Sequence, residues 1–329
     1  MIRIPEPYLV YLQHPLGLFV LFLLSSVVMI WRLQAVEGKG FEGTVLGSLI
    51  MPYCSGFANL TFAFVMARAG GNGKAVIENC IVNNVTNLTL ILGLAALFAG
   101  SQSTAPKGKK QTDIYRLYRL DLLLTLVALF LFTGTLWSLG KDRTLDRYDG
   151  LVLVALFLFW QVLHVFDILK NNVRRNRSFH RSIVLDLLLI GLCAYGIYFS
   201  VDALVQWASA PGNRWVSSDY LGWLSGALMV LPNAMIAVYY AFKGRQDIVV
   251  SSQVGDSHIC IPMCIGLYAL FDKVQVPGFF EVGVFTILGA AAVHFLGIAV
   301  LGRLPRILGA GLLAGYATFL YLGLAQGAG

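Results

Sequence analysis

The chain has 329 residues, of which 57% are hydrophobic and only 12% are charged, and its mean hydropathy is +0.73. A water-soluble protein of this composition would expose far too much apolar surface, so the composition excludes a soluble domain and predicts a polytopic membrane protein. The net charge of +7 needs no nucleic-acid partner, because basic residues of a membrane protein gather beside anionic lipid headgroups.

Apolar runs of about 17 to 25 residues are long enough to cross the hydrocarbon core of a bilayer as helices. In chain order, ten such runs occupy residues 16–32, 43–67, 74–99, 119–139, 148–169, 182–207, 217–242, 247–271, 279–302 and 306–326. The N-terminus lacks the pattern of a cleaved signal peptide, so the first run is expected to remain as a helix. The sequence therefore predicts an all-α polytopic membrane protein with ten transmembrane helices.

The positions of lysine and arginine predict the orientation of these helices. If the N-terminus lies outside, the expected cytoplasmic loops hold 16 of the 24 basic residues. The densest basic segments, 107–119 and 170–181, then face the inner leaflet. We expect an integral protein of the cell (inner) membrane with its N-terminus outside.

An internal repeat divides the ten helices into two sets of five. A shift of 174 residues places Asn59 on Asn233, and a shift of 173 places the hexapeptide beginning at Gly93 on the one beginning at Gly266. An odd number of crossings in each set means that the second copy enters the membrane from the opposite side. We expect an inverted pair, with a first repeat at 1–169, a short basic cytoplasmic linker at 170–181 and a second repeat at 182–329.

Polar side chains gather in two helix pairs, one in each repeat. Three asparagines recur every fourth residue from position 79, which puts them on one helix face, and a matching stripe follows Ser252. Polar groups inside a membrane are costly unless they face a partner or an ion path, although asparagine and serine also join helices by hydrogen bonds. The candidate cation-site residues are Ser55, Asn59, Asn83, Asn87, Asn233, Asp256 and Cys260, with Glu78, Asn79 and Ser252 as secondary candidates.

The same residues resemble a known family. The segments 76–87 and 90–93 are similar to the G-N-x-x-G-S-N-x-x-N…L-x-L-G half of the α-repeat of the sodium/calcium exchanger family. Residues 231–250 resemble the L-P-E…K-G…D-I-A-x stretch of that family, and Val201-Asp202 is similar to its Val-Glu pair. The resemblance implies the exchanger fold and secondary active cation antiport.

The departures from the family pattern concern charge. In the pattern G-T-S-x-P-E, each repeat of the family supplies a glutamate that binds the cation, and here these positions match Asn59 and Asn233. The other oxygen ligands of the family map to Asn83 and Asn87 in the first repeat and to Asp256 and Cys260 in the second. The chain therefore resembles a divergent member of that family without either glutamate. One carboxylate with neutral amides balances a monovalent cation better than a divalent one.

The leading hypothesis is a secondary cation antiporter with an altered substrate, a monovalent ion such as Na⁺ or K⁺, exchanged for H⁺ at Asp256. The sequence contains no G-x-x-x-x-G-K-[ST] loop, which fits transport without ATP. No resident cofactor is expected, because the inorganic cation is the substrate. One alternative is a degenerate exchanger that serves as a sensor or assembly partner without transport.

Two further readings have less support from the sequence. Soft-metal transport would use residues near the mapped site, namely Cys54, Cys260, Cys264, Met229, Met263 and His258. An intramembrane enzyme is the least supported reading, because neither H-E-x-x-H nor G-x-S-x-G occurs and His164, Asp167 and His294 read as packing groups. The five cysteines fall within predicted helices, so no disulfide framework is expected.

Overall fold

The structure is a computed structural model of the whole chain. It describes residues 14–37, 53, 56–98, 109–172, 183–208, 210, 220–243, 246–302 and 304–327. Within these ranges, the side chains of some helical residues are not described, including those of residues 109–118 and 167–172. The candidate Ser55 and the neighbouring Cys54 lie outside the described residues.

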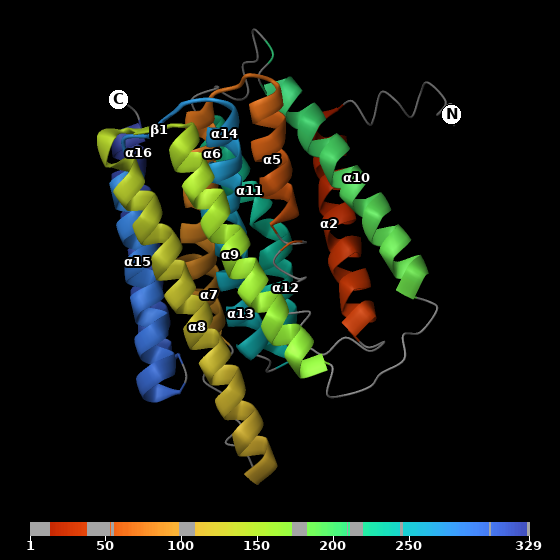
Figure 1. Cartoon of the computed structure of the whole chain (residues 1–329), viewed down its shortest axis with the longest axis vertical. Coiled ribbons are helices and arrows are strands. Elements are labelled where there is room, and N and C mark those ends of the chain that lie inside the picture. Colours follow the sequence, from red (N-terminus) through yellow and green to blue (C-terminus); the bar gives the residue numbers. More distant parts are fainter. Residues whose placement is uncertain are drawn as a thin grey trace.

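Nearly all of the described chain is helical, with short 3₁₀ or π segments labelled η (Figure 1). The elements are α2 (Pro15–Glu37), α5 (Phe57–Arg68), α6 (Gly73–Val85), η2 (Thr86–Ile91), α7 (Leu92–Phe98), α8 (Lys109–Leu139), η3 (Gly140–Asp142), β1 (Thr144–Leu145), α9 (Arg147–Asn172), α10 (Ile183–Ala208), α11 (Leu221–Met229), α12 (Leu231–Phe242), α13 (Gln246–Ile259), η5 (Cys260–Cys264), α14 (Ile265–Phe271), β2 (Val274–Gln275), α15 (Phe280–Leu296), η6 (Gly297–Leu301) and α16 (Arg306–Gly327).

Among the described residues, eight helical stretches are long and apolar enough to cross a membrane, and Phe57–Arg68 is a shorter apolar helix. Helices suit this environment because every backbone N–H and C=O finds its partner within the same segment. The composition-based prediction of a helical, polytopic membrane protein is therefore confirmed.

Two predicted spans differ in detail from the helices. The fourth, expected at 119–139, belongs to the longer helix α8, whose 31 residues exceed the thickness of a hydrocarbon core. The seventh, expected at 217–242, is divided at Val230 into α11 and α12. Pro232 explains this break, because its ring clashes with the preceding turn and its nitrogen carries no hydrogen.

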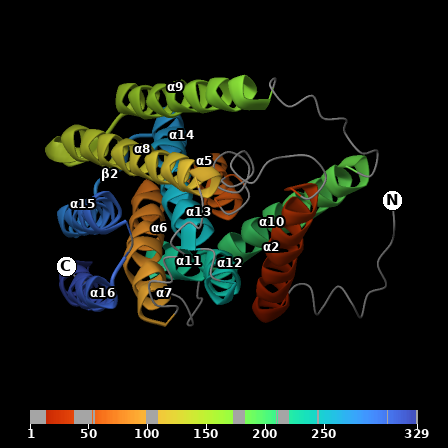
Figure 2. The same ribbon diagram turned by 90° about the horizontal axis from the view of Figure 1, so that it is seen from below.

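The stretches α6–η2–α7 and α13–η5–α14 lie in the middle of the assembly (Figure 2). In an 18-residue stretch of Gly73–Phe98 and of Ile248–Phe271, 72% and 78% of the residues are buried, whereas the corresponding share in α10 and in α16 is 22%. Most of the polar residues predicted to form a site belong to the two central stretches, so they are shielded from lipid by the surrounding helices.

The turn between α5 and α6 brings Asn59 back beside the asparagine stripe at 79, 83 and 87. Gly70 adopts a left-handed conformation with φ +61°, and the amide of Gly71 donates to the carbonyl of Met66 at 2.9 Å. Asn72 then caps α6, since its side chain accepts from the amide of Lys74 at 3.0 Å. The glycine and the cap together reverse the chain within a few residues.

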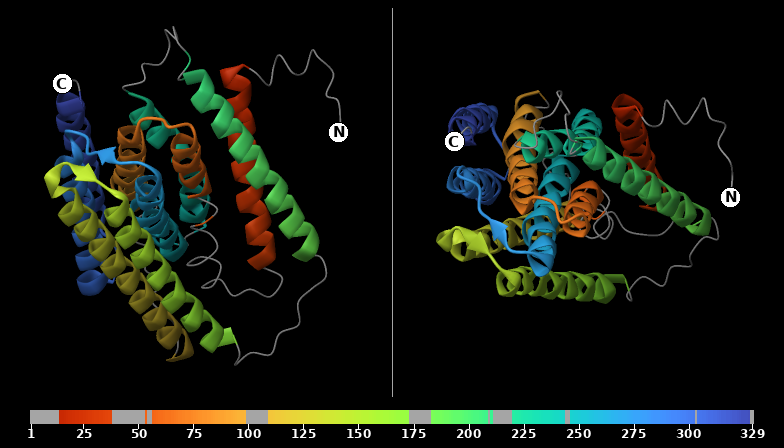
Figure 3. Two further views of the ribbon diagram at one scale, coloured as in Figure 1. Left: turned by 45° about the horizontal axis from the view of Figure 1, so that its top comes forward. Right: turned by 90° about the horizontal axis from the view of Figure 1, so that it is seen from above.

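Outside the central stretches, α2 and α10 lie on one side of the molecule and α8, α9, α15 and α16 on the other, as views from below and above show (Figures 2 and 3). Helices α2 and α10 pack against each other at one edge, and α10 also contacts α5. On the other side, β1 pairs with β2 in antiparallel register, with Thr144 opposite Gln275. This two-stranded link, which was not predicted from the sequence, ties the α8–α9 connection to the α14–α15 connection.

Candidate functional site

Asp256 lies on α13 at the centre of the molecule, and its side chain is fully buried. One carboxylate oxygen, Oδ2, accepts a hydrogen bond from Asn87 Nδ2 at 2.8 Å. Asn87 belongs to η2 in the predicted first repeat, so this contact joins the two predicted halves across 169 residues of sequence. A buried carboxylate that accepts an amide hydrogen is stabilised relative to one left without a donor.

From Asn87 a chain of carboxamides continues toward α5. Asn87 Nδ2 also donates to Asn83 Oδ1 at 2.9 Å, and Asn83 Nδ2 donates to Asn59 Oδ1 at 3.3 Å. All three asparagines are fully buried. We call Asn59, Asn83, Asn87 and Asp256 the amide–carboxylate chain. It brings together four of the seven primary candidates.

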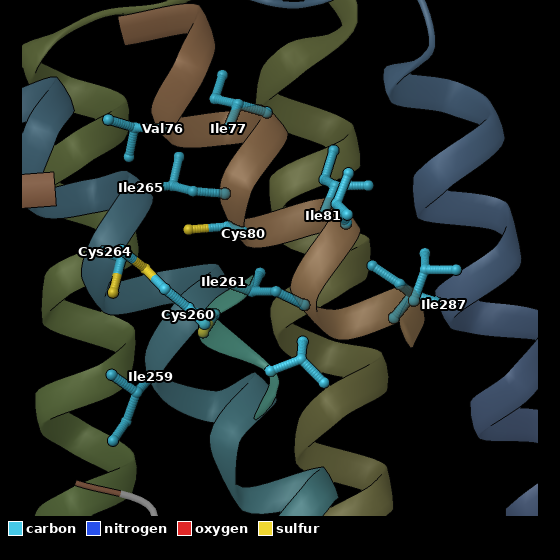
Figure 4. Packing of buried hydrophobic residues seen from close by; sticks show 14 of the residues in the cluster. Val76, Ile77, Cys80, Ile81, Ile259, Cys260, Ile261, Cys264, Ile265 and Ile287 are labelled. Carbon is cyan, nitrogen blue, oxygen red and sulfur yellow. The ribbon is translucent and has the colours of Figure 1, made fainter. Parts of the chain in front are cut away.

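Cys260 adds a thiol to this chain. Its Sγ lies 3.9 Å from both Asn83 Oδ1 and Asp256 Oδ2, which is the range of a weak sulfur hydrogen bond. Figure 4 shows Cys260 and Cys264 across from Cys80, where η5 and α14 pack against α6. Cys80, Cys193, Cys260 and Cys264 are free, as expected for thiols in membrane helices.

Two π-helical segments interrupt the central helices beside the amide–carboxylate chain. They are η2 at Thr86–Ile91 and η5 at Cys260–Cys264, and they contain Asn87 and Cys260 respectively. The shift that aligns Asn87 with Cys260 thus also overlays the two irregular turns. π-segments leave the regular hydrogen-bond pattern and are frequent at functional sites.

Asn233 is 1% exposed, and neither its Oδ1 nor its Nδ2 has a hydrogen-bond partner among the described residues. Its backbone carbonyl accepts from Gln253 Nε2 at 3.2 Å. The chain that links the first-repeat asparagines therefore has no counterpart at Asn233. This side chain is buried, as predicted, but with unused hydrogen-bonding capacity.

Gln253 is a polar residue of the central helices that was not among the residues predicted to form the site. It is fully buried, and its Nε2 also contacts Ser252 Oγ at 3.2 Å while its Oε1 has no partner among the described residues. A signal was present in the sequence, because a glutamine three residues before Asp256 in an apolar helix is as costly as the asparagines.

The secondary candidates face other neighbours. Asn79 Nδ2 donates to Ser225 Oγ at 3.0 Å and contacts Met229 Sδ at 3.5 Å, both on α11. Ser252 Oγ donates to the backbone carbonyl of Val249 at 3.1 Å. Glu78 forms an ion pair with Lys74 at 3.9 Å near the start of α6.

The three asparagines of the predicted stripe at 79, 83 and 87 consequently have partners on different helices. Asn83 and Asn87 join Asn59 and Asp256, whereas Asn79 turns toward α11. Successive positions four residues apart rotate slowly around a helix, so their side chains need not meet the same neighbour.

Of the residues of the soft-metal reading, Cys54 lies outside the described residues, and His258 contacts groups of α8 and α9. His258 Nε2 lies 2.9 Å from the carbonyl of Thr125, and its ring packs edge-on against Phe132 and Trp160. Among the residues that the structure describes, no group of three or more His, Cys, Asp or Glu side chains could hold a metal ion. His258 therefore serves helix packing against α8 and α9.

The enzyme reading gains nothing from the histidines. His294 is fully buried on α15, and its Nε2 lies 2.8 Å from the carbonyl of Leu88 in η2. This contact satisfies a carbonyl of an irregular turn, as expected for a packing group. The side chains of His164 and Asp167 lie outside the described residues.

The sequence matches the family described as sodium/calcium exchanger protein over residues 10–166 and 185–325, which is most of the chain. The chain belongs to the sodium/calcium exchanger family. Members of this family are transporters and not enzymes, so the chain is an integral membrane protein with a cation antiporter fold. The resemblance read from its motifs is confirmed.

A curated relative is the sodium/calcium exchanger MaX1 of Methanosarcina acetivorans, which is 25% identical over 153 residues. The matched region covers 44% of this exchanger-family chain and 40% of that relative. The fold match is longer. The sodium-calcium exchanger NCX_Mj, soaked with 2.5 mM Na⁺ and 10 mM Sr²⁺, aligns with a TM-score of 0.68 at 19% identity, covering 93% of this chain and 98% of that one.

A second solved structure of NCX_Mj, soaked with 2.5 mM Na⁺ and 0.1 mM Ca²⁺, aligns with a TM-score of 0.66 at 20% identity. It covers 93% of this chain and 97% of that one. At this level of identity the likeness establishes a common fold, and the ion specificity has to be argued from the residues of the site.

Proposed function

We propose that the protein is a secondary active antiporter that carries a monovalent cation, Na⁺ or K⁺, in exchange for H⁺. The observation that carries this proposal is the amide–carboxylate chain, in which Asp256 supplies a single negative charge among neutral carboxamides. The candidate ligands are the residues of that chain with Cys260, and Asn233 and Ser55 by their positions in the repeat.

Charge balance favours a monovalent substrate. A buried ion costs several kcal/mol unless opposite charge compensates it, so a divalent ion in such a site requires about two carboxylates. The two positions where the family pattern has glutamates hold Asn59 and Asn233, which are neutral. Asp256 alone balances one positive charge. Either a monovalent metal cation or a proton can supply that charge.

We further propose ten membrane crossings in two inverted repeats, at 1–169 and 182–329, joined by the basic linker 170–181, with the N-terminus outside the cell membrane. Several features support this architecture. The α5–α6 pair contributes Asn59 and a central helix, and the α12–α13 pair contributes Asn233 and a central helix. A π-segment follows the central helix in both cases, η2 after α6 and η5 after α13. The family match itself is interrupted between residues 166 and 185.

The experiment that tests the function is a flux screen in proteoliposomes across Na⁺, K⁺, H⁺, Ca²⁺, Mg²⁺ and Zn²⁺. We expect Na⁺ or K⁺ flux coupled to an opposite pH gradient, and no Ca²⁺ flux under the same conditions. Ca²⁺ flux with tight Ca²⁺ binding by the unmodified protein would contradict the charge argument.

A second candidate function is a non-transporting member of the family. The observation that favours it is that the side chains of the amide–carboxylate chain are hydrogen-bonded to one another from Asn59 to Asp256. Such a chain is also suited to hold α5, α6 and α13 together. A correctly folded protein without flux of any of the six ions would favour this function over antiport.

A further inference from the structure

The two repeats treat their buried carboxamides differently. In the first repeat Asn59, Asn83 and Asn87 are hydrogen-bonded to one another and reach Asp256, so each side chain has at least one partner. Asn59 Nδ2 and Asn87 Oδ1 have no partner among the described residues. In the second repeat Asn233 and Gln253 are equally buried, yet Asn233 Oδ1, Asn233 Nδ2 and Gln253 Oε1 have no hydrogen-bond partner among the described residues. Each such atom costs free energy comparable to a lost hydrogen bond.

Asn233 and Gln253 are neighbours in the structure. Gln253 Nε2 donates to the backbone carbonyl of Asn233 at 3.2 Å, which holds the glutamine of α13 against the first turn of α12. Gln253 also precedes Asp256 by three residues on the same helix, so the two side chains lie one turn apart on neighbouring faces.

We propose that Gln253 is a cation ligand, and that with Asn233 it forms a neutral subsite for a partly hydrated monovalent cation beside Asp256. This proposal rests on the proposed function and names a ligand that the family-pattern positions do not include. Two carboxamide oxygens, Asn233 Oδ1 and Gln253 Oε1, are available to replace water around the ion. A water retained by the cation can accept the hydrogen of Asn233 Nδ2 with its second lone pair.

The chemistry of the subsite selects the class of ion. Its ligands are neutral, so it offers dipoles and no charge of its own, and the compensating charge comes from Asp256 one turn away. A divalent cation would lack a second carboxylate, and a soft metal would lack thiolates at these two residues. A weakly hydrated monovalent cation such as K⁺ loses its water to carbonyl-type oxygens most readily.

A structural role for Gln253 makes a different prediction. If the amide only joins α13 to α12 through the Asn233 carbonyl, its removal lowers stability and leaves ion preference unchanged. If it binds the cation, its removal alters the ratio of Na⁺ to K⁺ affinity. Gln253→Met tests this, because methionine has nearly the length and size of glutamine but has no oxygen.

The experiment uses the full chain in detergent, titrated calorimetrically with NaCl and with KCl. We expect Gln253→Met to weaken binding of the preferred ion about 10- to 100-fold, the range for a lost interaction with a charged partner, and to change the Na⁺/K⁺ ratio. Gln161→Met is the matched control. Gln161 on α9 also has an unpartnered buried amide oxygen, but α9 lies outside the central helices. Its substitution should leave both affinities unchanged.

Gln253→Glu gives a second measurement that does not depend on loss of binding. A carboxylate at this position adds a negative charge near Asp256, so a cation subsite should gain Sr²⁺ or Ca²⁺ binding that the wild type lacks. A purely structural position would instead show a less stable protein with no divalent binding, because the new charge would be buried without compensation.

Rb⁺ soaking separates the subsite from the transport function. An anomalous peak between Asn233 Oδ1 and Gln253 Oε1 supports the subsite, and a water molecule alone at that place overturns it. Rb⁺ bound there in a protein without flux would overturn the antiport and leave the subsite standing. Flux with an unchanged Na⁺/K⁺ ratio in Gln253→Met would overturn the subsite and leave the antiport standing.

Discussion

At the scale of single residues, the distinctive property of this protein is how little charge its buried centre contains. Asp256 accepts from Asn87, and the next two groups of the chain are the amides of Asn83 and Asn59. A carboxamide has nearly the shape of a carboxylate but carries no charge, so the geometry of the family pattern can persist while the ion it suits changes.

Asp256→Asn should abolish cation-dependent flux, to below about 1% of wild type, while the protein stays folded. The amide preserves shape but removes the charge that compensates the cation, a loss of about 3 kcal/mol or more. Flux in proteoliposomes and thermal unfolding measure the two effects. Glu281→Gln is the control, since Glu281 is 55% exposed and pairs with Arg143 at 3.4 Å. Normal flux by Asp256→Asn together with none by Glu78→Gln would show that the mapped site is wrong.

The double substitution Asn59→Glu and Asn233→Glu should create Ca²⁺ affinity, at least about tenfold above wild type. It supplies two carboxylates where the family pattern has them, and a divalent ion in an oxygen site needs that charge. Repulsion between the carboxylates favours protonation of one of them at low pH, so the gain should grow from mildly acidic to alkaline pH. Calorimetry across that range measures it. A folded double variant with no gain at any pH would mean that the two positions do not face one site.

At the scale of elements, close helix contacts position the site. Helix α11 approaches α6 through Gly222 and Gly226, and a Cβ at Gly226 would lie 2.7 Å from the carbonyl oxygen of Asn79. Small residues allow such approaches between membrane helices. The backbone of Asn79 cannot move away without disturbing the turn that carries Asn83.

Gly226→Ala should therefore destabilise the protein by about 1–3 kcal/mol, the usual cost of overpacking, and reduce cation binding as well. Gly191→Ala on α10 is the matched control, because a Cβ there would meet nothing within 4 Å. Thermal unfolding in detergent and Na⁺ titration provide the two measurements. Equal unfolding temperatures for the two variants would contradict the close α6–α11 contact.

At the scale of the whole molecule, two ion pairs fasten α10 to its neighbours. Arg32 on α2 pairs with Asp186 at 3.5 Å, and Arg68 on α5 pairs with Asp202 at 3.3 Å. The side chains of the first pair are 23% and 2% exposed, and those of the second are 57% and 22% exposed. Water screens the second pair more strongly, so the first contributes more to holding α10.

Arg32→Gln should accordingly lower the unfolding temperature more than Arg68→Gln does. We expect a cost of about 1–3 kcal/mol for the first substitution, as for a lost hydrogen bond to a charged group, and less than about 1 kcal/mol for the second. The difference should persist in high salt, because a buried pair is screened less. Equal effects that both vanish in high salt would show that Asp186 is solvated in the membrane-embedded protein.

Sequence alone determined the membrane class, the family and most of the candidate residues. Hydropathy is a local property of each run, so the apolar spans could be found without knowing their neighbours. The repeat and the motifs marked Asn59, Asn83, Asn87 and Asp256, and these are the residues that form the amide–carboxylate chain. Their burial follows from the cost of polar groups in lipid.

Only the tertiary structure decided which polar groups meet. Asn79 contacts Ser225, His258 contacts the Thr125 carbonyl, and Gln253 donates to the backbone carbonyl of Asn233. A hydrogen bond between distant helices depends on their rotation and depth, which periodicity within one helix does not specify. The π-segments and the break before Pro232 change that rotation locally, so the partners on either side of them could be assigned only once the helices were packed.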